Sequence, residues 1–358
     1  MRRFLWKWHG LLGLIVAVPL FIIALSGSLL VFKAELDAWL SPEQVLASAD
    51  SRLGFGQLLK HADQALPEHE ILGWEFAANG EADSLYVAKM GSYEWQKLWL
   101  DPATGELLSP PMSMTHMLTD WLLELHYTLL LDHAGLLLSA LVSVLLILLG
   151  LSGIVLHRHF WRTLFTLRFG RGLRLLLSDG HKMLGILGMP VFLILGFTGA
   201  WWNIEHFIDE ELGVHDDSQF VLTKRYYNAE LDFDAMLAAT QEALPGFVAT
   251  YVRLPDPSYP GVHFFGHQDN KGPLRSRFGS IISFDDQTAK LSSSFDVRTA
   301  GTLYQFVDSF RPLHYGTFGG LTTRILWCLL GFLPCLMALS GFWMWRSRVR
   351  GRKRTARR

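Results

Sequence analysis

The sequence contains only two cysteines, Cys328 and Cys335, and both lie in its last apolar stretch. The polar segments therefore hold no cysteine and cannot be cross-linked by disulfide bonds. The chain also has no glycine-rich dinucleotide fingerprint. Its long polar segments show no Ser/His/Asp set, no phosphate-binding loop and no paired metal-ligand motif. These absences exclude a disulfide-stabilised domain and a built-in nucleotide-binding domain.

Long apolar runs are abundant instead. Half of the 358 residues are apolar, and they concentrate in four runs at residues 11–32, 134–156, 183–204 and 325–345. Each run has roughly the 20 residues that a helix needs to cross about 30 Å of hydrocarbon. We therefore predict a membrane α-helical protein with four transmembrane helices and two long polar inserts.

The distribution of charge predicts the orientation of these helices. The N-terminal tip, the short segment between the second and third runs, and the tail after Trp345 are all strongly basic. The two inserts are acidic, with 16 acids against 4 bases in residues 34–133 and 16 against 9 in residues 205–321. Basic flanks stay in the cytoplasm, so we expect both termini inside and both inserts outside. Beside a membrane helix, a basic tail indicates lipid contact rather than nucleic acid.

The chain repeats itself. "LHY" occurs at residues 125–127 and 313–315, and "LSG" follows each copy at the same distance, at residues 151–153 and 339–341. "HGLLGL", starting at His9, matches "HKMLGI", starting at His181, and the inserts share "QALP" and "EALP". Both halves thus read as helix, outer α+β domain, helix, in the same orientation. Two parallel repeats imply a pseudo-two-fold axis along the membrane normal.

These patterns predict a division into eight parts. They are transmembrane helix 1 with a cytoplasmic N-terminus (residues 1–33), outer domain 1 (34–133), transmembrane helix 2 (134–157), a basic cytoplasmic link (158–182), transmembrane helix 3 (183–204), outer domain 2 (205–321), transmembrane helix 4 (322–345) and a basic cytoplasmic tail (346–358).

Histidines are the candidate functional residues. His9 and His181 lie at the cytoplasmic ends of the runs, and His126 and His314 lie towards the outer ends. A single interfacial histidine usually needs no ligand, because its polar tip can reach the headgroup region. Two pairs at equivalent positions of a duplicated unit favour ligation of a metal. His157, His159 and His206 are reserve candidates, and the sequence leaves the pairing open.

Haem is the metal group that these pairs favour. Neutral imidazole is a common axial ligand of haem iron, and helical bundles build such sites from facing helices. Zinc is the rival metal, but the apolar surroundings and the lack of carboxylate or thiolate partners disfavour it. No Cys-x-x-Cys-His motif occurs, which excludes covalent c-type attachment through it. Each pair could therefore hold one haem iron, and no catalytic residue is predicted.

Three segments carry a resemblance to a known family. They are "WHGLLGLIVAVPLFIIALSGSLLVFKAELD", "HRHFWRTLFTLRFGRGLRLLLSDGHKMLGILGMPVFLILGFTGAW" and "LHYGTFGGLTTRILWCLLGFLPCLMALSGFWMWRSR". They resemble the first helix, the central link with the third helix, and the last helix of the PepSY-associated transmembrane family. The two inserts are similar to degenerate PepSY domains.

Four-helix members of that family include the FoxB-like ferrisiderophore reductases of the bacterial inner membrane. The resemblance implies a dihaem cytochrome b, an oxidoreductase that passes electrons outward to a periplasmic ferric siderophore and so serves iron uptake. It makes His9, His181, His126 and His314 the haem-ligand candidates. The electron donor would be a cytoplasmic protein or a membrane quinol, because the link is too short to house a flavin domain.

Two alternatives stay open. The first is a non-redox PepSY-type protein that binds peptides or restrains a periplasmic protease. The second is a transport accessory that binds a siderophore without reducing it. Arg324 and Arg311, which flank His314, are candidate partners of haem propionates. For Arg324 the competing interpretation is a helix-end side chain that extends to the headgroups.

Overall fold

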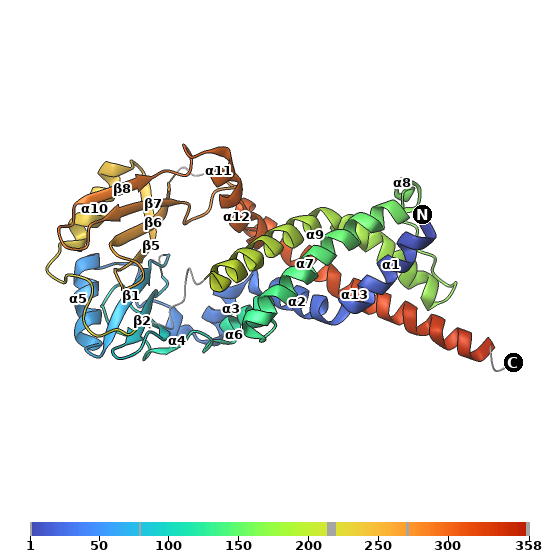
Figure 1. The fold of residues 1–358 in the computed structure, drawn as a ribbon, viewed down its shortest axis with the longest axis horizontal. Helices are drawn as coiled ribbons and strands as arrows, with labels where there is room; N and C mark the ends of the chain where they lie inside the picture. The colour runs from blue at the N-terminus through green and yellow to red at the C-terminus, as the bar shows by residue number, and fades with distance from the viewer. Residues whose placement is uncertain (1, 79, 213–219, 270–271, 356–358) are drawn as a thin grey trace. The chain divides into compact units, whose positions relative to one another are not determined.

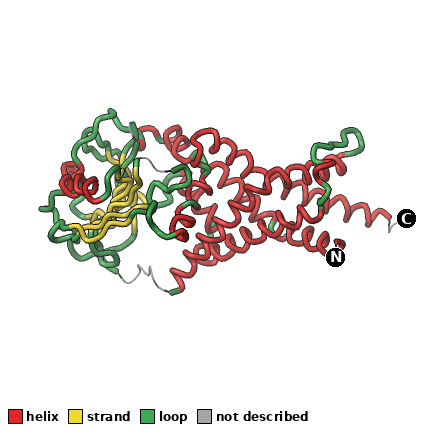
Figure 2. Tube along the Cα trace, turned by 90° about the horizontal axis from the view of Figure 1, so that it is seen from above, coloured by secondary structure: helices red, strands yellow, loops and turns green. Residues whose placement is uncertain are grey.

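In a computed structural model of the full chain, the structure describes residues 2–78, 80–212, 220–269 and 272–355. The chain divides into two compact units, each assembled from separated stretches of sequence. The first unit comprises Met1–Phe32, Trp121–Leu212 and Leu313–Arg358, and the second comprises Lys33–Asp120 and Gly213–Pro312. Helices build the first unit, and the strands belong to the second (Figures 1 and 2).

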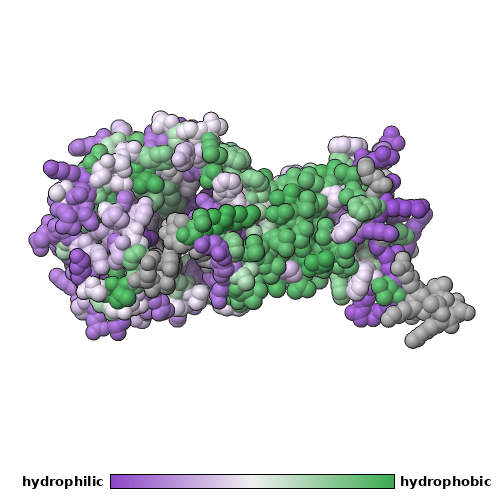
Figure 3. All heavy atoms as spheres, in the orientation of Figure 1, coloured by the Kyte–Doolittle hydropathy of each residue, from purple (hydrophilic) through white to green (hydrophobic). Residues whose placement is uncertain are grey.

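Long helices dominate the first unit. They are α1 (Arg2–Ile15), α2 (Ala17–Leu30), α7 (Asp132–Leu156), α9 (Leu173–Glu211) and α13 (Gly320–Thr355). Among the described residues, three helices are long and apolar enough to cross a membrane, and α1 with α2 makes a fourth if this bent pair is one span. Figure 3 shows the apolar surface that these helices present. The chain is thus a membrane protein with up to four spans.

The first span is bent by 63° between α1 and α2, at Val16. We predicted one transmembrane helix over residues 1–33, and the structure divides it into two helices. Pro19 has no amide hydrogen, so the carbonyl of Ile15 loses its partner four residues later, and the proline ring crowds that carbonyl. The prediction recognised the apolar run correctly, and Pro19, which interrupts this run in the sequence, accounts for the bend.

Several predicted boundaries differ from the observed helix ends. α9 begins at Leu173, inside the predicted link 158–182, and ends at Glu211, beyond residue 204. α13 continues to Thr355, through most of the predicted tail 346–358, whose last three residues lie outside the described part. Apolar runs mark the stretch that lipid covers, whereas the helix extends further because arginine and lysine are good helix formers.

The long helices pack in two equivalent pairs. α7 lies against α9, and α2 lies against α13, while α9 also contacts α13. The repeat relates α2 to α9 and α7 to α13, so it exchanges the two pairs. Short helices complete the unit: α6 (Leu118–Thr128), α8 (Phe160–Thr163), α12 (Phe310–Tyr315) and the 3₁₀ turn η2 (Thr317–Gly319). The two "LHY" copies lie in α6 and α12.

The second unit contains one antiparallel sheet of eight strands. Its order is β4-β3-β2-β1-β5-β6-β7-β8. The strands are β1 (His69–Glu75), β2 (Asp83–Lys89), β3 (Trp95–Leu100), β4 (Met112–Ser113), β5 (Phe247–Arg253), β6 (Val262–Gln268), β7 (Ser280–Phe284) and β8 (Leu291–Phe295). The helices of this unit are α3 (Lys33–Leu40), α4 (Pro42–Val45), α5 (Phe55–Ala65), α10 (Phe233–Ala243) and α11 (Thr302–Asp308).

The two inserts share this sheet, whereas we expected two separate domains at residues 34–133 and 205–321. β1 of the first insert pairs with β5 of the second, with Trp74 opposite Val252. These two residues are equivalent in the repeat, so the pairing is symmetric about them, as in an isologous interface. β1 and β5 would otherwise each expose an unpaired edge, and their pairing removes both edges. Residues 213–219 and 270–271 of the second insert lie outside the described residues.

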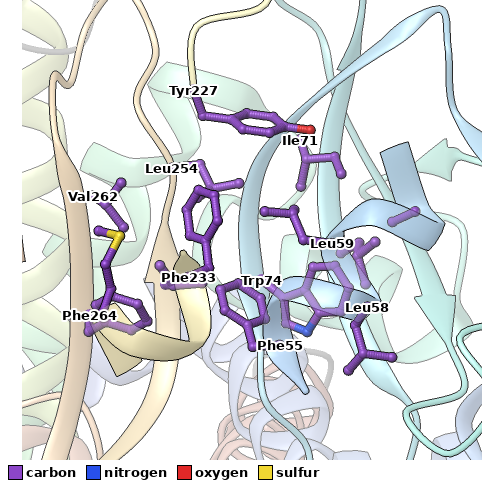
Figure 4. Packing of buried hydrophobic residues seen from close by; sticks show 14 of the residues in the cluster. Phe55, Leu58, Leu59, Ile71, Trp74, Tyr227, Phe233, Leu254, Val262 and Phe264 are labelled. Atoms are coloured by element: carbon purple, nitrogen blue, oxygen red, sulfur yellow. The ribbon is translucent and has the colours of Figure 1, made fainter. Parts of the chain in front are cut away.

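The core of the second unit lies between the sheet and the helices α5 and α10 (Figure 4). Phe55 on α5 packs edge-on against Trp74 at 5.4 Å and against Phe233 of α10 at 6.0 Å between ring centroids. The indole of Trp74 donates to buried Asp83, which also accepts two N–H groups of Arg52 at 2.6 and 2.8 Å. A buried carboxylate is tolerated when donors surround it in this way.

Candidate functional site

Four histidines in the first unit are held in the same way. Each ring lies against a Ser-Gly or Thr-Gly dipeptide on a neighbouring long helix. His9 contacts Ser152-Gly153, His126 contacts Ser26-Gly27, His181 contacts Ser340-Gly341 and His314 contacts Thr198-Gly199. We call each such dipeptide a cradle. The cradles of His9 and His181 are the "SG" of the two "LSG" copies, so the repeated motif supplies the partners of repeated histidines.

The hydroxyl group of each cradle lies near the Nδ1 atom of its histidine. The distance from Nδ1 to the hydroxyl oxygen is 2.7 Å for His9, 2.9 Å for His181 and 2.7 Å for His314. His126 differs, because its Nδ1 is 3.4 Å from the Ser26 hydroxyl and 2.9 Å from the carbonyl oxygen of Ile23. In all four histidines, Nδ1 is the nitrogen that the helices engage.

The hydrogen bonds that each hydroxyl donates within its own helix indicate the tautomer of its histidine. Ser152 and Ser340 donate to carbonyls three residues earlier, at 3.1 Å each, and Thr198 donates to the carbonyl of Ile194 at 2.8 Å. With its hydrogen given to the carbonyl, the hydroxyl accepts, and Nδ1–H is then the donor of the bond to the ring. The carbonyl of Ile23 is likewise an acceptor for Nδ1–H of His126. In the neutral form of this tautomer the lone pair lies on Nε2, which is the nitrogen that could bind a metal.

The outer pair, His126 and His314, comes together inside the bundle. Their ring centroids are 6.2 Å apart, and the ring planes make an angle of 71°. An imidazole nitrogen binds a metal at about 2.0–2.1 Å, and the ring centre lies about 1 Å further, so two rings on opposite sides of one metal have centres about 6 Å apart. The observed spacing fits one metal shared by the two rings.

A cavity of about 400 Å³ adjoins this pair. It is lined by both histidines and by residues of α2, α7, α9 and α13, most of them apolar. Volumes of this size are typical of small-molecule and cofactor sites. The cavity also includes His206, one of the reserve candidates, and Trp202, whose ring centroid is 5.1 Å from that of His314. The two histidines of the outer pair thus lie beside a largely apolar, partly open cavity.

The histidine rings pack against the cradle glycines, and the space between ring and glycine differs from one cradle to another. A Cβ atom on Gly27 would approach Cε1 of His126 to 2.5 Å, which is far inside contact distance. A Cβ on Gly153 or Gly341 would stand 3.9 or 3.8 Å from Cε1 of His9 or His181, an ordinary contact. A Cβ on Gly199 would stand 3.6 Å from Cε1 of His314 and 3.3 Å from the hydroxyl oxygen of Ser143, so among the four cradles that of His126 has the strictest steric need for glycine.

The inner pair, His9 and His181, lies towards the other end of the bundle. α9 carries His181 and also Thr198, the cradle of the outer His314. These residues are seventeen positions apart, which is about 26 Å along a helix. That separation is most of the roughly 30 Å thickness of a bilayer core. The two histidine sites are therefore placed near opposite faces of the spanning region.

The remaining candidates occupy other positions. His157 follows the last residue of α7, and His159 precedes α8. Arg324 donates two N–H groups to the carbonyl of Val31, at 3.2 and 2.7 Å, and its guanidinium lies 4.7 Å from the Phe32 ring centroid. Its observed contacts thus join α13 to the end of α2.

Arg311 belongs to the second unit, where its guanidinium lies 4.7 Å from the ring centroid of Phe278. The propionate roles of Arg324 and Arg311 stay predictions.

The donor set bears on the choice of metal. Across the described ranges, no group of three or more His, Cys, Asp or Glu side chains is arranged to hold a metal ion. Each histidine pair thus offers two protein ligands, and structural zinc takes four. Haem iron draws its remaining ligands from the macrocycle, so two axial histidines suffice. The residues present fit haem better than a bare ion.

The sequence did not reveal the cradles. Ser26, Ser152, Thr198 and Ser340 read as ordinary small residues of membrane helices, which commonly pack in this way. The available signal was their position: Ser26 and Thr198 lie at one distance after His9 and His181, and Ser152 and Ser340 lie at one distance after His126 and His314.

Comparison with known proteins agrees with this architecture. The profile of the PepSY-associated TM region family matches residues 6–348, which is most of the chain, so the protein belongs to this family. An uncharacterized protein of Pseudomonas aeruginosa, PA4219, is 29% identical over 254 residues, or 64% of this chain. The matched region is 63% of the length of that curated relative.

Proposed function

We propose that this member of the PepSY-associated TM region family is a dihaem b-type cytochrome of the bacterial inner membrane. It carries electrons outward and reduces ferric iron held by a siderophore in the periplasm. The observation that carries the proposal is the shared placement of four histidines. Each has Nδ1 against an oxygen atom of a neighbouring helix, an arrangement in which Nε2 is the nitrogen that would bind a metal.

In this proposal His126 and His314 hold the outer haem b, and His9 and His181 hold the inner one. Bound haem supplies reversible one-electron chemistry. The chain contributes the orientation of the ligands, because each Nδ1–H···O bond fixes the ring and raises the basicity of the opposite nitrogen. The apolar lining of the outer cavity limits access of water, which also influences the redox potential.

The positions of the two sites support electron transfer across the membrane. They lie about 26 Å apart along α9, measured by helix rise. Each ferric ion gains one electron, and a two-electron donor such as a membrane quinol therefore serves two ferric ions. Reduction releases the iron because Fe(II) is held less tightly than Fe(III) by hard oxygen ligands. The ferric siderophore and the donor rest on the resemblance to FoxB-like ferrisiderophore reductases.

The proposal is tested with the full chain in sealed vesicles. Purified protein should be red, with a Soret band that shifts when dithionite is added. Vesicles loaded with a reductant should reduce a ferric siderophore outside, measured by a ferrous-specific dye, and His9→Ala should abolish this transfer. A colourless preparation would support the non-redox alternative, a PepSY-type protein that binds peptides. A red preparation without transfer would leave a cytochrome with another acceptor.

A further inference from the structure

The outer cavity is not symmetric, although the repeat relates its walls. One wall is formed by α7 and α9, and the other by α2 and α13. Counting from the repeated motifs, Ser139 corresponds to Trp327, Asn203 to Val31 and His206 to Ala34. The α7/α9 wall therefore carries a polar side chain at each of these three positions. At the equivalent positions, the α2/α13 wall has only the indole N–H of Trp327. We call Ser139, Asn203 and His206 the polar strip.

Ser139 is the informative member of the strip. It is 2% exposed, lines the cavity, and its hydroxyl has no hydrogen-bond partner among the residues that the structure describes. A buried hydroxyl without a partner is energetically unfavourable, because it loses its hydrogen bonds to water without replacement. Ser26, Ser28, Ser152 and Ser340, by contrast, all donate to carbonyls of their own helices.

The polar groups around Ser139 already have partners. The carbonyl three residues earlier, on Leu136, already lies 3.5 Å from the side-chain amide of Asn203. That amide also donates to the carbonyl of Tyr127 at 3.0 Å. Across the cavity, the equivalent Trp327 uses its indole N–H for the carbonyl of Leu313 at 2.6 Å. The indole N–H on the α2/α13 wall thus has a partner within the protein. The Ser139 hydroxyl on the α7/α9 wall is a donor that a molecule in the cavity could use.

We infer that the polar strip binds the carboxylate edge of the porphyrin in the outer site, with the Ser139 hydroxyl donating to a carboxylate oxygen. The inference rests on the proposed function and identifies the residues that orient its cofactor. Two equivalent histidines alone would accept the macrocycle facing either wall. A carboxylate needs donors when it leaves water, and only the α7/α9 wall offers a vacant one among the described residues. The strip therefore selects one of two orientations.

The test compares haem b with its dimethyl ester, whose carboxylates are blocked. Full-length protein made without haem is titrated with each porphyrin, and binding is followed by the Soret band. Wild type should prefer the diacid. Ser139→Ala should reduce the diacid-to-ester affinity ratio about tenfold, the effect of losing one hydrogen bond to a charged group. Ser139→Thr keeps a hydroxyl and should restore most of the ratio.

Ser28→Ala is the matched control, because Ser28 lines the same cavity but its hydroxyl is bound to the carbonyl of Ala24 at 2.8 Å. It should leave the ratio unchanged. An equal ratio in wild type and Ser139→Ala would overturn the inference while leaving the cytochrome proposal intact. Failure of wild type to bind either porphyrin would contradict the proposed function, and this inference with it.

Discussion

At the scale of single residues, the four cradles share their chemistry but differ in steric tolerance. Gly27 has no room for a side chain beside His126, whereas Gly153 leaves an ordinary contact beside His9. Tight packing in a helical interface is not easily relieved, because neighbouring side chains are close-packed. The outer site should therefore be sensitive to a single methyl group where the inner site is not.

We predict that Gly27→Ala removes the outer haem. The added methyl would meet the His126 ring at 2.5 Å, so the ring must move. Its Nε2 atom would then no longer point at the proposed haem iron. Optical spectra of the purified variant should show about half of the wild-type haem. Gly153→Ala is the control and should keep both. Equal haem content in the two variants would show that the cradle geometry does not govern binding.

In the second unit, Glu70 is a buried carboxyl group with a raised pKa. Its side chain is fully buried in β1, and Oε2 has no hydrogen-bond partner within the described part of the chain. Burial raises the pKa of Glu70 from 4.5 to about 7, and the donated N–H of Tyr226 and the charge of Arg225, 3.6 Å away, offset only part of this. The folded carboxyl thus holds its proton up to about neutral pH.

The second unit should lose stability as pH rises through 7. The folded state binds a proton that the unfolded chain releases near pH 4.5, so the contribution of Glu70 is complete below pH 4.5 and disappears above the folded pKa of about 7. The expected loss between pH 5.5 and 8 is on the order of 2 kcal/mol. Hydrogen exchange of β1, corrected for intrinsic rate, measures it. Glu70→Gln, which mimics the protonated form, should flatten the profile; an identical profile would refute the assignment.

At the scale of elements, the turn from α6 to α7 is strained. Leu129, Leu130 and Asp132 all have positive φ, at 54°, 58° and 47°. The equivalent turn in the second repeat uses Gly316 and Gly320, at 71° and 65°. Side chains in this region cost roughly 1–2 kcal/mol each, and glycine avoids that cost. The first repeat therefore places strain immediately after His126, as functional sites often do.

Leu130→Gly should stabilise the protein, because it relieves positive φ at an exposed position. We expect a gain of about 1 kcal/mol, visible as a higher melting temperature in detergent. Leu131→Gly is the matched control: Leu131 is similarly exposed but has φ of −115°. In Leu131→Gly the substitution only raises the conformational entropy of the unfolded chain. It should lower the free energy of unfolding by about 0.5–1 kcal/mol. A lower melting temperature for Leu130→Gly would mean that the leucine contributes packing that exceeds its strain.

Elements were also where sequence reasoning succeeded most and failed most clearly. Four apolar runs predicted the spanning helices, because lipid imposes length and composition on them. The ends of α9 were missed, since helix ends depend on caps and local hydrogen bonds that a hydropathy run does not report. The β1–β5 pairing was missed because strand pairing joins residues far apart in sequence.

At the scale of the whole molecule, the internal repeat appears in both units. In the first, it relates the helix pairs α2/α13 and α7/α9 and their cradles. In the second, it relates the halves of the sheet about Trp74 and Val252. The "LHY" echo is matched by the approach of His126 and His314 in the structure, and the role of the four histidines as ligands stays a prediction. The sequence echoes could not predict the polar strip, because it exists only where the halves differ.

The orientation in the membrane gives a prediction for the complete chain. Basic segments flank the cytoplasmic ends, so reporter fusions after Asp101 and Asp285 should report the periplasm. Fusions after Arg171 and Arg352 should report the cytoplasm. Alkaline phosphatase and green fluorescent protein give opposite signals in the two compartments and serve as mutual controls. A cytoplasmic signal at Asp101 or Asp285 would contradict the proposal that electrons are carried outward.

The central claim is that His126 and His314 share one haem while His9 and His181 share another, and counting haems tests it most directly. A pyridine haemochrome assay of the purified wild type should give close to two b haems per chain. His126→Ala and His314→Ala should each give close to one, with the same haem lost. The double variant should also retain one, because both residues act on a single site. A haem-free wild type, or a double variant that loses more than either single variant, would contradict the account.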